Sequence, residues 1–235
     1  MYQSHSVHGE YFVDAKKFPG VWIVTAAFSI LFVNAGLGFY GLAVYLNAYV
    51  RELHFNVTMV SLAVTWFFVV SGVSNIFIAR LVRLYDIRHL VYVGGVGGAI
   101  SLILFGQVHN EVQMFLVYTL FGLTWGFAGI VPLSTIVTRW FEKGRAVALA
   151  TAAIGTSAGG IFLGPITKQL IDKTGLQMGS IWVGIFWFFA TCIPAVLFLR
   201  SSPTDLGWLP DGEPIVNNHV PELRGTDFQV AIHSR

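Results

Sequence analysis

Residues 155–160 read GTSAGG, the Gly-x-Ser-x-Gly spacing that presents a serine nucleophile at a strand-to-helix turn in many hydrolases. Such a serine needs a base within hydrogen-bond reach of its hydroxyl. All seven histidines lie in tails, in loops or at the ends of apolar segments: His5, His8, His54, His89, His109, His219 and His233. Ser157 instead lies inside the long apolar run ALATAAIGTSAGGIFLG, so we expect no catalytic residue and no enzyme. The enzyme alternative predicts that a serine-reactive probe labels Ser157.

The same run favours helix packing. Between Ala150 and Gly160, every residue except Ile154 is Ala, Gly, Ser or Thr. Small residues four positions apart let two helix backbones approach closely, which matters in lipid because apolar burial gives no drive between helices there. We therefore assign helix packing and gating to Gly155, Gly159, Gly160, Gly164 and Pro165.

The composition indicates that these residues belong to a membrane protein. Apolar residues make up 55% of the 235-residue chain and charged residues 11%, whereas soluble domains carry about a quarter charged residues. A membrane-spanning helix needs ~20 predominantly apolar residues. The sequence predicts six such spans, near residues 21–49, 59–79, 90–108, 112–137, 146–170 and 180–199.

The expected fold is an all-α membrane domain of six transmembrane helices over residues 21–200, between two polar tails. Residues 1–20 form a cytoplasmic N-terminal tail, and residues 201–235 form a cytoplasmic loop or tail that we expect to be disordered. The first span lacks a small-residue cleavage site, so it is predicted to be retained rather than removed as a signal peptide. The lone Cys192 can make no disulfide within the chain.

The orientation of the domain follows from the basic residues near the span ends, because cytoplasmic loops carry the excess of Lys and Arg. One side collects Lys16, Lys17, Arg80, Arg83, Arg88, Arg139, Lys143, Arg145 and Arg200. The other side carries Arg51, Lys168 and Lys173. This asymmetry predicts a cytoplasmic N-terminus in the plasma (inner) membrane, and the small net charge of +2 gives no reason to expect nucleic-acid binding.

The middles of the predicted spans hold amide, hydroxyl and aromatic side chains but essentially no ionisable ones. A buried amide must find a partner or line water, so two interpretations stay open: hydrogen bonds between helices, or the lining of a substrate cavity. An aromatic-Gly-apolar-Ala pattern shared by residues 40–43 and 125–128 favours the cavity, since transporter repeats surround a midplane site. The candidate cavity residues are Asn34, Tyr40, Asn47, Trp66, Tyr118, Thr124 and Trp125.

Residues 122–171 contain the more specific motifs GLTWG, RWFEKGRAVALA and a Gly-rich helix that ends in Pro165 and QLI. This stretch resembles the major facilitator superfamily, and within it the monocarboxylate-transporter and oxalate–formate-antiporter branch, whose loop between helices four and five commonly reads W-F-x-x-R-R-G-x-A. The matching positions are Trp140, Phe141, Arg145, Ala148, Gly155, Gly159, Gly160, Pro165, Leu170 and Ile171. The resemblance covers residues 18–213 and implies the N-terminal half of a twelve-helix transporter.

The chain departs from the superfamily pattern in places that bear on mechanism. The loop between helices two and three usually reads G-x-L-x-D-R-x-G-R-R, and here it is ARLVRLYDIRH. The resemblance implies an acidic latch in this loop, which is altered here or moved to Asp86. It also marks five residues as a cytoplasmic loop motif: Arg83, Asp86, Arg88, Arg139 and Arg145. Proton-coupled members carry basic residues where this chain has Tyr118 and Tyr40, so proton coupling through this half is disfavoured.

The resemblance implies alternating-access transport of a small organic solute, with carboxylates as one candidate class. The expected partners are that solute, the lipid bilayer and a second six-helix half, which is either a missing C-terminal half or another copy of this chain. We expect no cofactor and no metal. The alternative is a non-transporting six-helix membrane protein that acts as a truncated partner or regulator.

Overall fold

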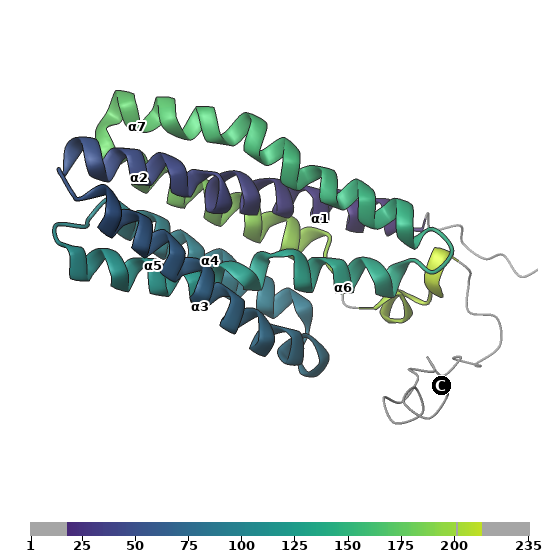
Figure 1. The fold of residues 1–235 in the computed structure, drawn as a ribbon. Coiled ribbons are helices and arrows are strands. Elements are labelled where there is room, and N and C mark those ends of the chain that lie inside the picture. The colour runs from purple at the N-terminus through teal and green to yellow at the C-terminus, as the bar shows by residue number, and fades with distance from the viewer. Residues whose placement is uncertain (1–17, 201, 213–235) are drawn as a thin grey trace, which may run out of the picture.

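The computed structural model describes residues 18–200 and 202–212, so the predictions for residues 1–17, 201 and 213–235 lie outside the described part. The described part is an elongated bundle of α-helices, as predicted (Figure 1). Its elements are α1 (Gly20–Val33), η1 (Asn34–Phe39), α2 (Gly41–Glu52), α3 (Val57–Leu84), α4 (Ile87–Phe105), α5 (Glu111–Trp125), η2 (Gly126–Ala128), α6 (Ile130–Trp140), α7 (Arg145–Leu197), η3 (Pro203–Leu206) and η4 (Pro210–Gly212).

Five helical segments of the described residues are long and apolar enough to cross a membrane: Gly20–Glu52, Val57–Leu84, Ile87–Phe105, Glu111–Trp140 and Arg145–Leu197. The first four overlap the first four predicted spans. The fifth and sixth predicted spans both fall within α7, which has 53 residues. The sequence therefore predicts six spans where the structure has five long helices, and the difference lies entirely in α7.

Gly175 explains how α7 can hold two predicted spans. Its backbone has φ +79° and ψ +163°, a conformation that glycine adopts readily and that no helix contains. The chain reverses direction there, and the lighter green second arm returns along the bundle (Figure 1). The first arm packs against α1 and the second against α4, where the indole of Trp187 donates to the carbonyl oxygen of Gly94 at 3.2 Å.

Short polar loops set the helix starts through side-chain caps. The amide oxygen of Asn56 accepts from the backbone N–H of Thr58 at 2.8 Å, and that of Asn110 accepts from Gln113 at 2.9 Å. Asp86 caps α4 in the same way, by accepting from the backbone N–H of Arg88 at 2.8 Å. Such caps satisfy helix N–H groups that have no partner inside the helix, so the residue that the sequence suggests as a latch begins a helix.

The glycines of α7 bring its first arm into backbone contact with α1 and η1. A Cβ at Gly155 or Gly159 would overlap the carbonyl oxygen of Phe28 or Phe32, respectively. From the other side, a Cβ at Gly36 would lie 2.6 Å from the carbonyl oxygen of Gly159. Small residues four positions apart thus lie where the two backbones come close, and their role in gating stays a prediction.

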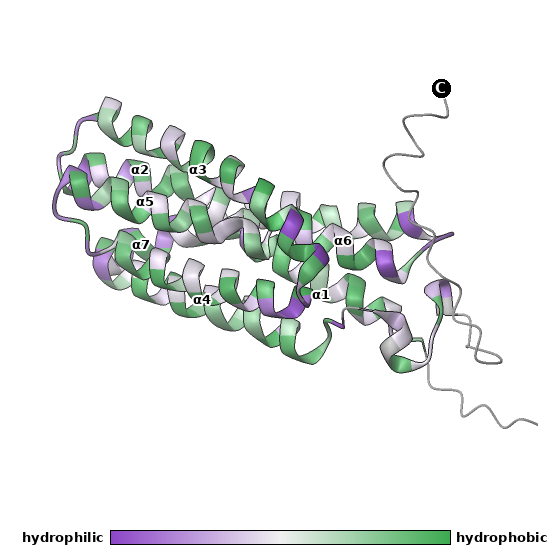
Figure 2. Ribbon diagram, turned by 90° about the horizontal axis from the view of Figure 1, so that it is seen from below, coloured by the Kyte–Doolittle hydropathy of each residue, from purple (hydrophilic) through white to green (hydrophobic). Residues whose placement is uncertain are grey.

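The outside of the bundle is apolar, and hydrophilic residues gather mainly in loops and at helix ends (Figure 2). Large side chains such as Phe77 on α3 and Trp182 on α7 are more than half exposed. This arrangement suits a protein surrounded by hydrocarbon, where only helices satisfy their own backbone hydrogen bonds.

The segment after α7 folds back onto the loop between α6 and α7. The carboxylate of Asp211 accepts hydrogen bonds from three consecutive backbone N–H groups, of Glu142, Lys143 and Gly144; the shortest, from Lys143, is 2.7 Å. The indole of Trp140 donates to the carbonyl oxygen of Arg200 at 2.8 Å. These contacts join the start of α7 to the chain that follows its end.

The segment from Ser202 to Gly212 contains two short 3-10 helices, and the ring of Trp208 packs 6.0 Å from that of Phe18. The disorder predicted for residues 201–235 stays a prediction. The sequence analysis treated the whole tail as polar and missed that Asp211 could satisfy the uncapped start of a long helix.

Replacing Gly159 by leucine tests the helix contact. The new side chain must displace the backbone of α1, and overpacking of this kind costs about 1–3 kcal/mol. We expect a lower unfolding temperature in detergent, with expression retained. Gly164→Leu on the same helix is the matched control, because the nearest neighbour of a Cβ there is 3.9 Å away. Equal unfolding temperatures for the two variants would show that the contact is not close.

The contact of Asp211 should depend on pH. Backbone N–H groups, of Lys143 first and then of Gly144 and Glu142, hold the pKa of this carboxyl below its ordinary value. The stabilisation is therefore complete above the pKa of an aspartate in the unfolded chain and is lost as the pH falls through the lowered pKa. Amide hydrogen exchange, corrected for intrinsic rates, should show protection of Lys143 at neutral pH, and Asp211→Asn should remove most of it. Unchanged protection in that variant would contradict the assignment.

Candidate functional site

Two helical segments are interrupted near their middles, and the interruptions face each other. The segment α1–η1–α2 contains a π-helical stretch, Asn34–Phe39, and the segment α5–η2–α6 contains a 3-10 turn, Gly126–Ala128. π-Helical stretches occur mostly as local bulges and frequently at functional sites. Each interruption changes which backbone N–H and C=O groups are paired inside its helix. Groups at both interruptions therefore need hydrogen-bond partners from another part of the protein.

Asn34 and Trp125 provide those partners reciprocally. The amide of Asn34 donates to the carbonyl oxygen of Trp125 at 3.1 Å, and the indole of Trp125 donates to the carbonyl oxygen of Asn34 at 3.1 Å. Gly38 makes room, because a Cβ there would overlap the indole nitrogen. The hydroxyl of the adjacent Thr124 donates within its own helix, to the carbonyl oxygen of Leu120 at 3.0 Å. Asn34 and Trp125 are two of the predicted cavity residues, and they form hydrogen bonds between two helices. The interpretation as a link between helices therefore applies to both of them.

Tyr118 lies apart from this pair, in the interior of the bundle. Its side chain is fully buried, and its ring centroid is 4.7 Å from that of Phe105 on α4. Tyr45 packs on the other side of the same phenylalanine at 4.9 Å. The hydroxyl of Tyr118 has no hydrogen-bond partner among the described residues. Tyr118 thus belongs to a buried aromatic cluster and not to a surface open to solute.

Tyr40 and Asn47 lie on an exposed face of α2 that borders the first arm of α7. The ring of Tyr40 covers Gly160, where a Cβ would overlap it. Tyr40 is 44% exposed, and the amide of Asn47, also exposed, donates to the carbonyl oxygen of Ala43 at 2.8 Å. Positions 40, 47 and 51 share one helix face, so Arg51 extends the same polar stripe. We call the strip of surface between this face and α7, which includes a pocket lined by Asn47 and Arg51, the α2–α7 groove.

Trp66 occupies a fourth place, on the surface formed by α3 and α5. Its indole donates to the hydroxyl of Thr119 at 2.8 Å, and its side chain is 44% exposed. The seven cavity candidates are thus divided among the paired interruptions, the α2–α7 groove, the bundle interior and the α3–α5 surface. Sequence reasoning also missed Asn75 of α3, whose amide oxygen lies against Gly126.

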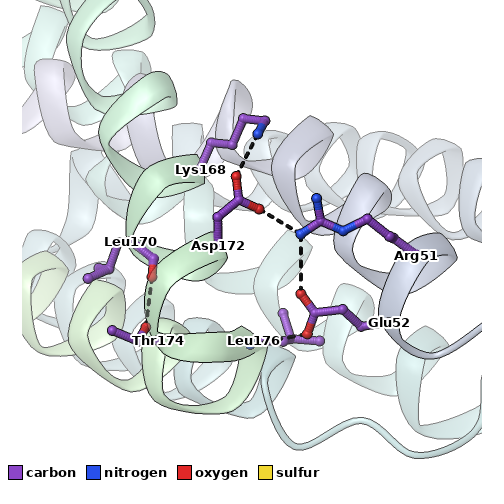
Figure 3. A network of polar contacts seen from close by, with 7 residues as sticks. All are labelled: Arg51, Glu52, Lys168, Leu170, Asp172, Thr174 and Leu176. Atoms are coloured by element: carbon purple, nitrogen blue, oxygen red, sulfur yellow. Dashed lines mark hydrogen bonds and ion pairs between the residues drawn. The ribbon is translucent and has the colours of Figure 1, made fainter.

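The largest feature that the sequence analysis missed is an ion cluster at the end of the α2–α7 groove (Figure 3). Nη2 of Arg51 lies 2.6 Å from one oxygen of Asp172, and Nζ of Lys168 lies 2.6 Å from the other. Next to this bridge is a cavity of about 110 Å³ that includes Asn47 in its lining. The four-residue spacing of Lys168 and Asp172 was the available signal, but the sequence analysis used these charges only for orientation.

The five residues of the predicted cytoplasmic loop motif have different surroundings. Arg139 links α6 to α3 by donating to the carbonyl oxygen of Val82 at 3.0 Å, and Arg145 donates to that of Phe141 at 3.3 Å. Arg83 is exposed, whereas the Nε atom of Arg88 is buried. The structure therefore gives Arg139 and Asp86 local structural contacts, and an inter-half latch remains a prediction.

Ser157 lies on an exposed face within the first arm of α7. Its helical surroundings differ from the strand-to-helix turn that a Gly-x-Ser-x-Gly nucleophile requires. The described residues contain no group of three or more His, Cys, Asp or Glu side chains that could hold a metal ion.

A single substitution tests the paired interruptions. Trp125→Phe keeps an aromatic ring but removes the N–H that serves the carbonyl oxygen of Asn34, which should lower the free energy of unfolding by about 1–2 kcal/mol. Trp66→Phe is the matched control, because it removes an exposed hydrogen bond to Thr119 and should cost less. Denaturant unfolding in detergent measures both, and an equal or larger loss in the control would contradict the assignment.

Comparison with known proteins agrees with the helical architecture. The profile of the Major Facilitator Superfamily matches residues 26–225. The uncharacterized transporter ESBP6 of Saccharomyces cerevisiae is 31% identical over 75 residues, which are 32% of this chain and 11% of the relative. The uncharacterized MFS-type transporter YcxA of Bacillus subtilis is 23% identical over 151 residues, 64% of this chain and 37% of the relative. The chain therefore matches less than two fifths of either relative's length.

The family match covers most of the chain, including four of the five long apolar helices in full and most of the first. Its members are membrane transporters and not enzymes, in agreement with the helical surroundings of Ser157. The chain is an integral membrane protein that belongs to the Major Facilitator Superfamily.

Proposed function

We propose that this protein carries a small organic solute across the plasma (inner) membrane by alternating access, and that the α2–α7 groove is part of the solute path. The observation that supports this most is the polar stripe of Tyr40, Asn47 and Arg51, exposed on a largely apolar exterior. Polar and charged groups are costly against lipid and normally face a bundle interior or water. The stripe therefore faces water or a second protein surface.

Six membrane crossings are part of the proposal. The arms of α7 on either side of Gly175, residues 145–174 and 176–197, would span about 45 Å and 33 Å at 1.5 Å per residue. Each exceeds the ~30 Å of hydrocarbon in a bilayer. The excess of Lys and Arg on one side supports a cytoplasmic N-terminus, which places Asp211 inside and the Arg51–Asp172 bridge outside.

A second six-helix half is the proposed partner, supplied by a C-terminal half or by another copy of the chain. An aromatic surface beside the stripe supports this. Phe39 and Phe68 have ring centroids 5.7 Å apart, and Phe39 and Tyr40 5.1 Å. All three side chains are more than 40% exposed. Packing against a second half would cover these rings and enclose the groove.

The monocarboxylate and oxalate–formate branch remains a proposal within the superfamily. It is supported by the motif residues Trp140, Phe141 and Arg145. Their contacts are structural: the indole of Trp140 fixes the chain after α7, and Arg145 donates to the loop carbonyl of Phe141. Carboxylates are accordingly the first solutes to test. The competing proposal is a non-transporting six-helix partner or regulator, which predicts no solute-dependent uptake.

Uptake by cells that express the chain distinguishes the two proposals. Labelled propionate should enter faster than in cells without the protein, and Asn47→Leu should raise the half-saturating concentration about tenfold, equivalent to ~1.4 kcal/mol, at unchanged expression. Trp182→Phe, on the apolar exterior of the second arm, is the control and should leave uptake unchanged. Equal uptake with and without the protein, across propionate and a panel of neutral and cationic solutes, would favour the non-transporting alternative.

A further inference from the structure

The ion cluster concentrates charge on a bundle that has little elsewhere along its helices. Arg51 and Glu52 end α2, and Lys168 and Asp172 lie one turn apart on the first arm of α7 (Figure 3). Asp172 holds one cation on each of its two oxygens, both at 2.6 Å. Glu52 is a more distant neighbour, 3.6 Å from Nη2 of Arg51, and its other oxygen accepts from the backbone N–H of Leu176 at 3.4 Å.

The two cations have donors to spare. Arg51 meets both Asp172 and Glu52 through Nη2, although a guanidinium carries five N–H donors and an ammonium three. The side chains of Arg51 and Lys168 are 62% and 61% exposed, whereas that of Asp172 is 33% exposed. The carboxylate is thus the more enclosed partner, and the cations present further donors towards the surface.

The adjoining cavity is small, and its lining combines apolar and polar groups. Its volume of about 110 Å³ equals roughly three to four water molecules at ~30 Å³ each. Ala43, Val44, Ala48 and Ile171 form an apolar wall, and Asn47, Arg51, Lys168 and Asp172 supply the polar groups. A few convergent polar groups in an apolar recess are typical of ligand sites.

We propose that this cluster is a recognition site for small carboxylates, in which Asp172 occupies from within the chain the position that a solute carboxylate takes. The geometry of Asp172 shows what the site accepts: a carboxylate that bridges Arg51 and Lys168, with one oxygen on each. An arriving carboxylate replaces Asp172 on the two cations and places its short apolar chain against Ala43, Val44 and Ile171. The number of ion pairs on Arg51 and Lys168 is then conserved.

The exchange also has a mechanical consequence. Arg51–Asp172 joins α2 to α7 at the Gly175 end of the bundle, so displacing Asp172 removes a link between the two walls of the groove. Binding of the solute carboxylate and breaking of the Arg51–Asp172 link therefore occur together. This role rests on the transport function proposed above, but binding at the cluster can be measured without transport.

Calorimetric titration of the full chain in neutral phosphatidylcholine nanodiscs tests binding, with propionate as the probe. Propionamide has nearly the same shape without the charge and serves as the control ligand. We expect saturable binding of propionate and at least tenfold weaker binding of propionamide. Equal affinities for the two ligands, or no propionate binding, would overturn the proposal.

Four variants separate recognition from a purely structural bridge. Arg51→Gln and Lys168→Gln should each weaken propionate binding at least about fivefold, whereas Lys173→Gln, which removes an exposed neighbouring lysine, should not. Asp172→Asn removes the internal competitor and should tighten binding about three- to tenfold. A structural bridge predicts no such gain, so unchanged or weaker binding by a folded Asp172→Asn protein contradicts the proposal. If this variant unfolds, Glu52→Gln, which leaves the bridge intact, should give a smaller gain and decides the question.

The outcomes for the site and for transport are distinguishable. Propionate binding with the expected variant pattern but without uptake would support the proposed site and contradict the proposed transport function. Saturable uptake that is insensitive to Arg51→Gln and Lys168→Gln would contradict the proposed site and support the proposed transport function.

Discussion

The reciprocal pairing of Asn34 with Trp125 is the interaction on which the remaining structure depends. Hydrocarbon offers no hydrogen bonds, so a helix interrupted inside a membrane must satisfy its polar groups within the protein. Each of these two residues provides a side-chain donor for the backbone carbonyl of the other. One interruption would be costly alone, and two opposed interruptions stabilise each other. The pair also fixes the segment α1–α2 against α5–α6 at mid-height.

The groove follows from that constraint. η1 is held against Trp125, and Tyr40 at its end covers Gly160 of α7. On the same arm of α7, Gly155 and Gly159 bring its backbone against that of α1. Asn47 and Arg51 follow on the same face, and Arg51 meets Asp172 at the far end. Tyr40, Asn47 and Arg51 thus lie along one line between two helices. Polar groups are costly against lipid, and this is the observation that supports the proposed solute path.

What the sequence predicted well depends on local patterns. Apolar runs of spanning length located the helices, because this signal lies in the local sequence. Gly155 and Gly159 lie against the backbone of α1, and the gating role assigned to them stays a prediction. The pairing of Asn34 with Trp125 and the bridge between Arg51 and Asp172 join residues 91 and 121 positions apart, and no local pattern encodes which distant group a polar side chain will meet. Tyr118 illustrates the same limit, since its helix face turned inwards to Phe105. Gly175 lies in the break that the sequence predicts between the spans at residues 146–170 and 180–199, although the helical assignment runs from Arg145 to Leu197.

The most direct test of the account is whether the α2–α7 groove is open to water and to solute. Asn47→Cys, in a background where the buried Cys192 is replaced by serine, can be labelled in membranes with a water-soluble, membrane-impermeant thiol reagent. The account predicts rapid labelling that propionate slows and propionamide does not. Labelling only by lipid-soluble reagents, or labelling that propionate leaves unchanged, would contradict the assignment of the groove to the solute path.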